Sequence, residues 1–234
     1  YEYINYLKKN YKHLNIICCD INAKAYCKYI SDQFFQIDIK NKKNILNLAR
    51  KLKVVGISSH ISEHGIGTIK YVSNKLNLPS SSEISVKATQ SKFYCKKILN
   101  EKNNYIKLEK FKINKIKKIN NNSPIVLKPD VGSGQRNLFK ITKNSKSKII
   151  KKKFFLSKNS SKNKFVAIEK FIKGEEINVV CLIINKKIYK FTYSLRKRYT
   201  KKEGFGVVYR HEYKSYDYLN LNNKIKNYIN KIIL

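Results

Sequence analysis

The sequence predicts an α/β protein in two parts, and two observations lead to that prediction. Residues 1–88 alternate short apolar runs with helical patterns, which is typical of a parallel sheet with helices on both faces. From residue 123 onward, short turns separate the apolar runs, which favours an antiparallel sheet. With 234 residues, 42% of them hydrophobic, the chain can form one large or two small domains with a real core.

The N-terminal part follows the order of a Rossmann-like domain. After an opening helix we expect a strand at Ile16, a helix from Asn22, a short strand at Phe34, a helix from Asn44, a strand at 54–58 and a helix from Glu63. Ligands bind at the carboxyl ends of strands in such sheets, so the loop 58–64 is expected near any substrate. The loop contains two histidines, His60 and His64. They are either acid–base groups or, as is more usual for histidines in loops, solvated or capping residues.

The C-terminal part begins with a helix that the segment 88–92 opens. A strand at 105–108, a turn at 120–123 and a basic helix between residues 145 and 164 are expected next. Two β-rich runs between residues 165 and 184 are joined by a charged turn at Lys173-Gly174.

An apolar run that ends in a lysine is the first candidate for function. Residues 124–128 end in Lys128, and the turn Gly132-Ser133-Gly134 and a second apolar run follow. Such a strand and turn are suited to a polyphosphate, because the ammonium supplies fixed charge and the turn supplies unobstructed backbone N–H groups. It is not a Walker loop, since no Gly-Lys-Ser/Thr opens a helix after the glycines. A plain β-hairpin with a Gly-Ser-Gly turn would have a similar sequence.

Two glutamates in the second β-rich segment are the next candidates. Glu169 ends an apolar strand, where a carboxylate is costly unless something donates to it. The backbone of Lys170 to Ile172 offers an edge of N–H and C=O groups to a purine, and Glu176 offers an acceptor to a ribose. The alternative is a hairpin whose acids balance nearby lysines.

Taken together and in this order, these segments resemble the ATP-grasp superfamily of carboxylate–amine ligases, which includes carbamoyl-phosphate-synthase-like and D-alanine-ligase-like enzymes. The resemblance covers essentially the whole chain. It implies that residues 1–88 are a pre-ATP-grasp domain without its first strand. Residues 89–234 would then be an incomplete α+β ATP-grasp domain, with the ATP-binding lid at 123–190.

The resemblance also implies how the phosphates of ATP are held. Lys92 resembles the lysine of the family's Thr-x-x-Lys segment, and Lys128 resembles the strand lysine at the α- and β-phosphates. The flexible loop over the phosphate tail corresponds to Ser133, Gly134 and Gln135. The family usually has a glycine where this chain has Asn137, and asparagine tolerates positive φ better than other non-glycine residues.

The remaining contacts with ATP are implied in the same way. Glu169 resembles the glutamate at the adenine amino group, with the Lys170 and Ile172 backbone at the adenine edge. Glu176 resembles the acid that binds the ribose. In the family the strand after this acid leads towards the acceptor substrate. Three arginines follow Glu176 in this chain: Arg196, Arg198 and Arg210. They either clamp a carboxylate or phosphoryl group or belong to an exposed basic strand.

Magnesium is the cofactor expected beside ATP, because phosphoryl transfer needs a cation bridging the phosphate oxygens. In the family its ligands lie on an acidic strand and a following Glu-x-Asn. No such pattern follows Glu176, so we identify no metal ligand in the chain and expect the ligands beyond residue 234. The absence of methionine and the helical patterns at both ends also predict a fragment. Its parent would activate a small carboxylate as an acylphosphate for attack by an amine or ammonia, while the fragment itself would be inactive.

The net charge of +36 raises a different hypothesis, a basic protein that binds nucleic acid or another polyanion. Against it, the charge is spread along the chain and comes almost entirely from lysine, whereas arginine is the residue that contacts phosphates bidentately. An AT-rich codon bias explains the lysines more simply, so we expect no nucleic-acid partner. A pseudoenzyme that binds ATP without turnover is a further alternative.

The cysteines and the apolar runs limit the remaining possibilities. Five scattered cysteines form no Cys-x-x-Cys, so neither a zinc site nor a disulfide scaffold is expected, and a reducing cytoplasm fits best. No apolar run approaches the roughly twenty residues of a membrane span. A homodimer is possible, and the acceptor carboxylate is not encoded in any motif.

Overall fold

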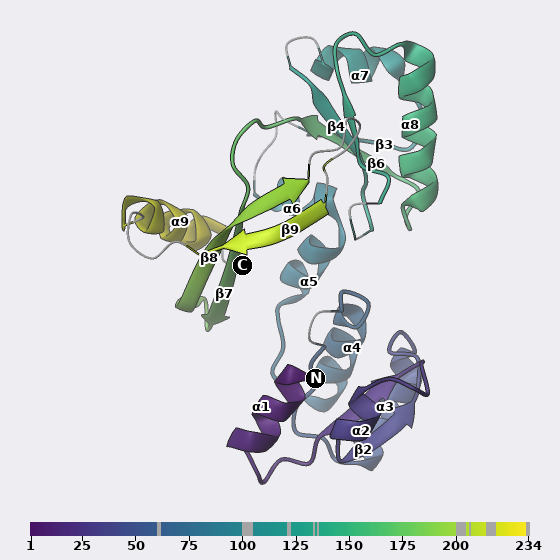
Figure 1. Cartoon of the computed structure of the whole chain (residues 1–234). Coiled ribbons are helices and arrows are strands. Elements are labelled where there is room, and N and C mark those ends of the chain that lie inside the picture. The colour runs from purple at the N-terminus through teal and green to yellow at the C-terminus, as the bar shows by residue number, and fades with distance from the viewer. Residues whose placement is uncertain are drawn as a thin grey trace. The chain divides into compact units, whose positions relative to one another are not determined.

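The computed structural model describes residues 1–59, 62–99, 105–120, 123–132, 134, 136–199, 205, 207–213 and 219–232. The chain divides into two compact units, Tyr1–Val86 and Lys87–Leu234 (Figure 1). In the described part of the chain, no helix combines the length and the apolar character that a bilayer crossing requires.

The first unit contains a small parallel sheet, as predicted. Its elements are α1 (Glu2–Asn10), β1 (Ile17–Asp20), α2 (Cys27–Ile30), β2 (Gln33–Gln36), α3 (Lys42–Lys51) and α4 (Ile66–Leu76). β1 and β2 pair in parallel with Cys18 opposite Phe34, and the segment that contains α2 makes the crossover that parallel strands need.

Helices α3 and α4 form the core of this unit. Their buried side chains are Ile45, Leu46, Ala49 and Val72. The start of α3 is capped by the Asn41 side chain, which accepts a hydrogen bond from the Asn44 N–H. At the other boundary α4 ends at Asn77, whose φ of 54° is left-handed, as is common where a helix ends.

Three details of the prediction are wrong. The predicted strand at 54–58 is irregular: the Val54 N–H donates to the Ala49 carbonyl at the end of α3, and Val55 is 81% exposed. The helix expected from Asn22 begins only at Cys27, because the Asn22 side chain accepts from the Lys24 N–H and holds a turn. The helix expected from Glu63 begins at Ile66. The segment 88–92 does open a helix as expected, because Ser91 caps α6 (Lys92–Ile98), and it also ends the preceding helix α5 (Glu83–Gln90).

The second unit contains two antiparallel sheets. The first has the order β3-β6-β4-β5, from β3 (Tyr105–Leu108), β4 (Ile125–Pro129), β5 (Phe139–Ile141) and β6 (Val166–Lys170). In its core, apolar residues of the strands pack against two helices, α7 (Ile113–Asn120) and α8 (Ser147–Ser160). Helix α7 was not among the predicted elements. The buried centre is Ile116, Ile125, Leu127, Ile141, Ile150, Phe154, Val166 and Ile168. In Figure 1, α8 runs alongside this sheet.

The second sheet has the order β7-β8-β9, from β7 (Ile177–Ile184), β8 (Lys187–Tyr199) and β9 (Val207–Glu212). The turn between β7 and β8 has positive φ at both Asn185 and Lys186, as a tight hairpin requires. Helix α9 (Leu219–Ile232) contacts this sheet where Lys226 lies over the Phe191 ring at 5.3 Å. The two β-rich runs at 165–184 therefore belong to different sheets and do not form a hairpin.

Candidate functional site

One face of the four-stranded sheet carries polar side chains, and the register of the strands explains why. β4 and β6 pair Val126 with Glu169 and Lys128 with Ala167. Since alternate residues of a strand point to opposite faces, Lys128 and Glu169 share a face, while the neighbouring residues point into the core beneath α7 and α8. The same rule adds residues of the outer strands to this surface, called here the polar face: Tyr105, Lys107, Lys128, Lys140 and Glu169.

Lys128 and Glu169, two of the predicted residues, form an ion pair on the polar face. The Lys128 ammonium donates to Oε1 of Glu169, and the two side chains are 15% and 19% exposed. The Lys96 ammonium lies 3.4 Å from Oε2 of the same carboxylate. Oε2 is buried and accepts no hydrogen bond from the described residues. Two cations thus balance the Glu169 charge, while one of its oxygens still lacks a hydrogen-bond donor.

The end of β4 is held by a buried carboxylate, Asp130, which the prediction missed. Asp130 accepts hydrogen bonds from the Ser91 hydroxyl at 2.9 Å, the Phe93 N–H at 2.8 Å and the Asn163 amide at 2.6 Å, and the Lys107 ammonium lies at 3.6 Å. These bonds fasten the start of α6 to the end of β4. The sequence contains a signal for this role, because an acid at the end of an apolar strand is costly unless hydrogen bonds satisfy it.

Lys92 lies at the start of the predicted phosphate loop. Its ammonium donates to the Gly132 carbonyl at 2.8 Å, and its backbone N–H donates to the Asp130 carbonyl at 3.2 Å. The first helical residue of α6 is thereby joined to the first glycine of the loop. Two other predicted loop residues lie outside the described residues: Ser133 and Gln135.

The loop contains the positive φ angles that its sequence predicted. Gly134 has φ of 72°, and Asn137, which stands where the family usually has glycine, has φ of 55°. The Asn137 carbonyl accepts a hydrogen bond of 2.7 Å from the Ser157 hydroxyl of α8. Asparagine therefore adopts the left-handed conformation that this turn requires.

The predicted adenine edge lies on the segment that connects the two sheets. β6 ends at Lys170, residues 171–176 form neither helix nor strand, and Ile172 is 84% exposed. The Phe171 N–H donates to the Pro124 carbonyl at 2.7 Å, which extends the pairing of β6 with β4 by one bond. The Lys140 ammonium of the polar face lies over the Phe171 ring at 4.0 Å.

Glu176, the predicted ribose acid, is bound by two of the three predicted arginines. Its Oε1 accepts from Arg196 Nη1 at 2.7 Å and from Arg198 Nη2 at 2.7 Å, and its Oε2 accepts from Arg198 Nε at 2.8 Å. Partial burial acts to raise the pKa of the Glu176 carboxyl, but the hydrogen bonds from Arg198 and Arg196 outweigh it, so the pKa lies below its ordinary value of 4.5. Arg210 lies apart from this cluster and pairs with Glu212.

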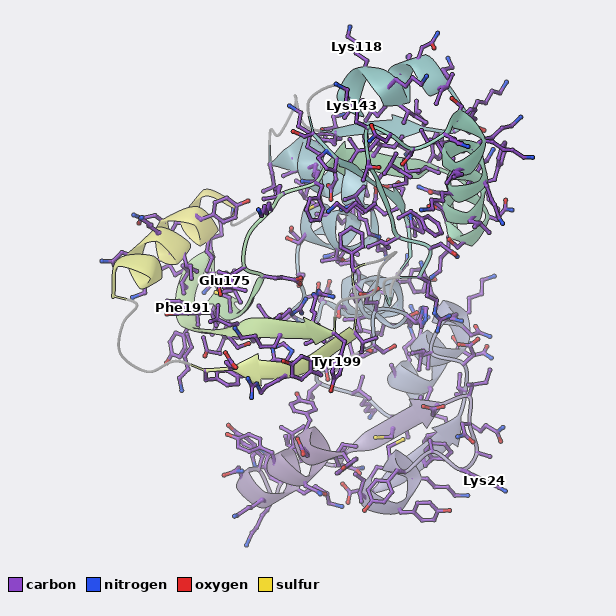
Figure 2. All side chains as sticks on the ribbon, turned by 45° about the horizontal axis from the view of Figure 1, so that its top comes forward. Lys24, Lys118, Lys143, Glu175, Phe191 and Tyr199 are labelled. Atoms are coloured by element: carbon purple, nitrogen blue, oxygen red, sulfur yellow. The ribbon has the colours of Figure 1, made fainter. Side chains whose placement is uncertain are left out.

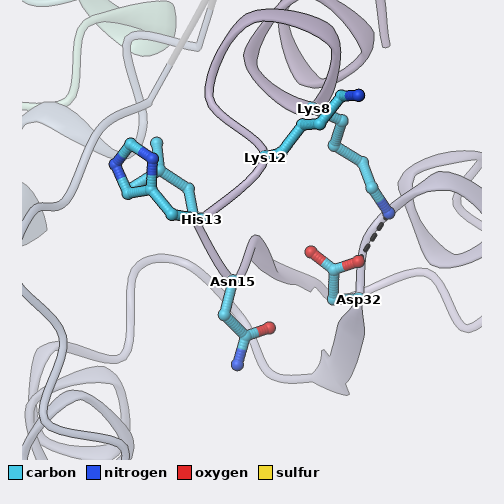
Figure 3. A pocket seen from close by; sticks show the side chains of 6 residues that line it. Lys8, Lys12, His13, Asn15 and Asp32 are labelled. Atoms are coloured by element: carbon cyan, nitrogen blue, oxygen red, sulfur yellow. Dashed lines mark hydrogen bonds and ion pairs between the residues drawn. The ribbon is translucent and has the colours of Figure 1, made fainter.

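The first unit contains a separate, shallow pocket that includes none of the predicted residues (Figure 3). It has a volume of about 370 Å³, and within its lining the Lys8 ammonium lies 2.5 Å from Asp32. The hydrogen bonds from Lys8 and from the Ile16 N–H lower the pKa of the Asp32 carboxyl. Of the two predicted histidines, His60 lies outside the described residues and His64 occupies a turn before α4.

No described residues form a candidate metal site. Among them, no three imidazole, thiol or carboxylate side chains lie close enough together to hold a metal ion. We assign no magnesium ligand among the described side chains. The ligands that the resemblance implies beyond residue 234 stay a prediction.

Neither protein-family models nor curated protein sequences match the chain, but solved structures do. It is similar to N5-carboxyaminoimidazole synthetase from Staphylococcus aureus, complexed with ADP, with a TM-score of 0.69 and 18% identity over 93% of this chain. It is similar to an L-amino acid ligase from Bacillus licheniformis, with a TM-score of 0.71 and 13% identity over 99% of this chain. A third match is D-alanine–D-alanine ligase from Bacillus anthracis, with a TM-score of 0.63 and 18% identity over 92% of this chain.

The chain spans 56% of the length of the synthetase and of the L-amino acid ligase, and 76% of the D-alanine ligase. Identities this low establish a shared fold and leave the substrate open. Structural similarity to these enzymes over 92–99% of this chain confirms the fold that the lysine strand, the glycine turn and the segment 169–172 predicted. Over part of the length of these enzymes, the chain has the ATP-grasp fold.

Proposed function

We propose that this chain is the ATP-binding portion of a ligase that activates a small carboxylate as an acylphosphate, which an amine or ammonia then attacks. In this proposal residues 1–88 are the pre-ATP-grasp domain, residues 89–234 are part of the ATP-grasp domain, and 123–190 form the ATP lid. The observation that carries it is the ion pair of Lys128 and Glu169 on the polar face, within a fold shared with ATP-dependent ligases.

Charge and hydrogen-bonding capacity on the polar face support ATP as the ligand. Lys128 and Lys92 bind the phosphates, with the loop around Gly134 closing over them. The adenine amino group donates to the Glu169 carboxylate, whose Oε2 accepts no hydrogen bond from the described residues. The backbone at Lys170 and Ile172 binds the adenine edge.

ATP binding on this face changes the partner of Lys128. Without nucleotide its ammonium balances Glu169; with nucleotide it binds a phosphate, and the adenine amino group takes its place at the carboxylate. Glu176, in the segment just before β7, contributes the ribose contact. Binding is the activity proposed for this chain itself, and phosphoryl transfer is proposed for the ligase of which it would form part.

Thermal unfolding with and without ATP tests this proposal. ATP at 100 times its Kd should stabilise the protein by about 2.7 kcal/mol, which raises Tm by roughly 5–10 °C. Lys128→Met should lose most of this shift. The matched control is Lys143→Met, which removes an exposed lysine of the same unit and should keep the full shift. Equal ATP shifts in both variants would refute the phosphate role of Lys128.

The net charge favours a second candidate, binding of nucleic acid or another polyanion, and the same assay distinguishes it. Lysine side chains extend outward from both units, for example Lys24 in the first and Lys118 and Lys143 in the second (Figure 2). A polyanion-binding protein would be stabilised by duplex DNA in a strongly salt-dependent manner and would show no specific response to ATP. The proposed ligase portion should respond to ATP at 200 mM salt and not to DNA.

A further inference from the structure

We propose that Arg196 and Arg198 form a binding site for the carboxylate of the acceptor substrate, and that Glu176 occupies this site until nucleotide binds. The inference rests on the proposed contact between Glu176 and the ribose. It also explains why ATP would bind before the acceptor substrate. The ribose of ATP has to bind the Glu176 side chain before the acceptor carboxylate can bind the two arginines.

The contacts of Glu176 are those of a bound carboxylate ligand. Arg198 binds it in a fork, with Nε and Nη2 both within 2.8 Å of its oxygens, and Arg196 adds a third donor. Planar guanidinium groups that bind a carboxylate bidentately give the strongest and most directional pairs of this kind. The Glu176 side chain is 43% exposed, so solvent and small ligands have access to the pair.

Other groups position the arginines, and this keeps the site in shape when Glu176 leaves. Arg196 Nη2 donates to the Asn178 side chain at 2.7 Å, and Arg198 Nη1 donates to the Phe205 carbonyl at 3.1 Å. Both arginines lie on β8, which pairs with β7 and β9. Arg196 Nε is buried and has no hydrogen-bond partner among the described residues. Glu176 binds Nη1 of this arginine and does not bind Nε.

Glu176, in contrast, stands where a side chain can change partner. It lies in the irregular segment 171–176, just before β7, and its backbone carbonyl accepts from the Arg196 N–H at 2.8 Å. A rotation of the side chain alone can therefore move the carboxylate from the guanidinium groups to a ribose hydroxyl. Because the same movement uncovers the arginines, nucleotide and carboxylate should each strengthen binding of the other, by about 10-fold.

Modification of the arginines by phenylglyoxal tests the inference without any catalytic assay. The chain has five arginines, so peptide mass spectrometry can follow each one: Arg50, Arg136, Arg196, Arg198 and Arg210. Saturating ATP should raise the modification rate of Arg196 and Arg198 by about 10-fold. 2′,3′-Dideoxy-ATP, which has no ribose hydroxyl to offer Glu176, should bind without this effect.

Two variants separate the role of Glu176 from a general loosening of the sheet. Glu176→Gln should react at Arg196 and Arg198 without nucleotide as fast as the ATP-bound wild type. Glu212→Gln, the matched control, should affect only Arg210, because Glu212 pairs with that arginine. In Glu176→Gln, acetate should slow the modification of Arg198, while chloride at equal ionic strength should not.

The outcomes are distinguishable. If ATP binds, as measured by equilibrium dialysis of the same sample, but leaves both arginine rates unchanged or lowers them, the masking role of Glu176 is wrong while the proposed function stands. Unchanged arginine rates in Glu176→Gln, or no protection by acetate, would also overturn the inference. If ATP does not bind at all, the proposed function fails and this inference fails with it.

Discussion

The ion pair of Lys128 and Glu169 yields a quantitative prediction, because the structure gives its exposure and its neighbours. Breaking a fully buried pair by removing one partner costs about 3–5 kcal/mol, whereas an exposed pair is worth about 0–1 kcal/mol. With 15% and 19% exposure this pair lies between those limits, and Lys96 remains 3.4 Å from the carboxylate when Lys128 is replaced. We expect Lys128→Met, which keeps the apolar stem, to lose about 2 kcal/mol of unfolding free energy.

A double-mutant cycle measures the pair itself. Urea unfolding of wild type, Lys128→Met, Glu169→Gln and the double variant should give a coupling energy of about 1–3 kcal/mol, because the second substitution removes a charge that the first has left unbalanced. The loss in the single variant corresponds to a fall in Tm of about 4–8 °C. At 1 M salt most of the coupling should persist, since partly buried pairs are weakly screened. Effects that add to within about 0.5 kcal/mol would show that the two groups do not interact, and the polar face would need another arrangement.

Four further predictions follow from single groups. Asp130→Asn should lose about 3 kcal/mol of stability in urea, because an amide cannot accept all the hydrogen bonds that converge on this buried site, while exposed Glu109→Asn should change little. Asn137→Gly should keep wild-type stability and Asn137→Ala should lose about 1 kcal/mol, since only the alanine is strained at φ of 55°; equal stabilities would argue against a left-handed turn. Burial raises the pKa of the Cys19 thiol to about 11, so at pH 8 about one thiol in a thousand is ionised, and iodoacetamide should label Cys19 far more slowly in native protein than in urea. The folded pKa of Glu176 lies below 4.5, so its stabilisation is present above that pH and is lost as pH falls through the folded pKa; the stability difference between wild type and Glu176→Gln should shrink from pH 6 to pH 3.

Much of the fold is local information that can be predicted from the sequence. The apolar run before Lys128, the apolar run before Glu169 and the basic helix between them all became regular elements, because short-range periodicity and turn residues specify them. The failures at 54–58 and at Asn22 have a common reason. An apolar run becomes a strand only when another strand pairs with it, and a helix start is displaced when a side chain such as that of Asn22 satisfies a turn.

The candidate site, like the fold, has features that the sequence indicates and features that only the tertiary structure shows. The sequence by itself indicated the candidate residues: a lysine and a glutamate at the ends of apolar runs, a glycine turn, and an acid with arginines after it. Only the tertiary structure decided that Lys128 meets Glu169 across 41 positions, that Asp130 is buried beneath α6, and that Arg196 and Arg198 bind Glu176. The physical reason is that strand order and register bring these side chains together, and both arise from the burial of apolar faces in three dimensions, which no local pattern records.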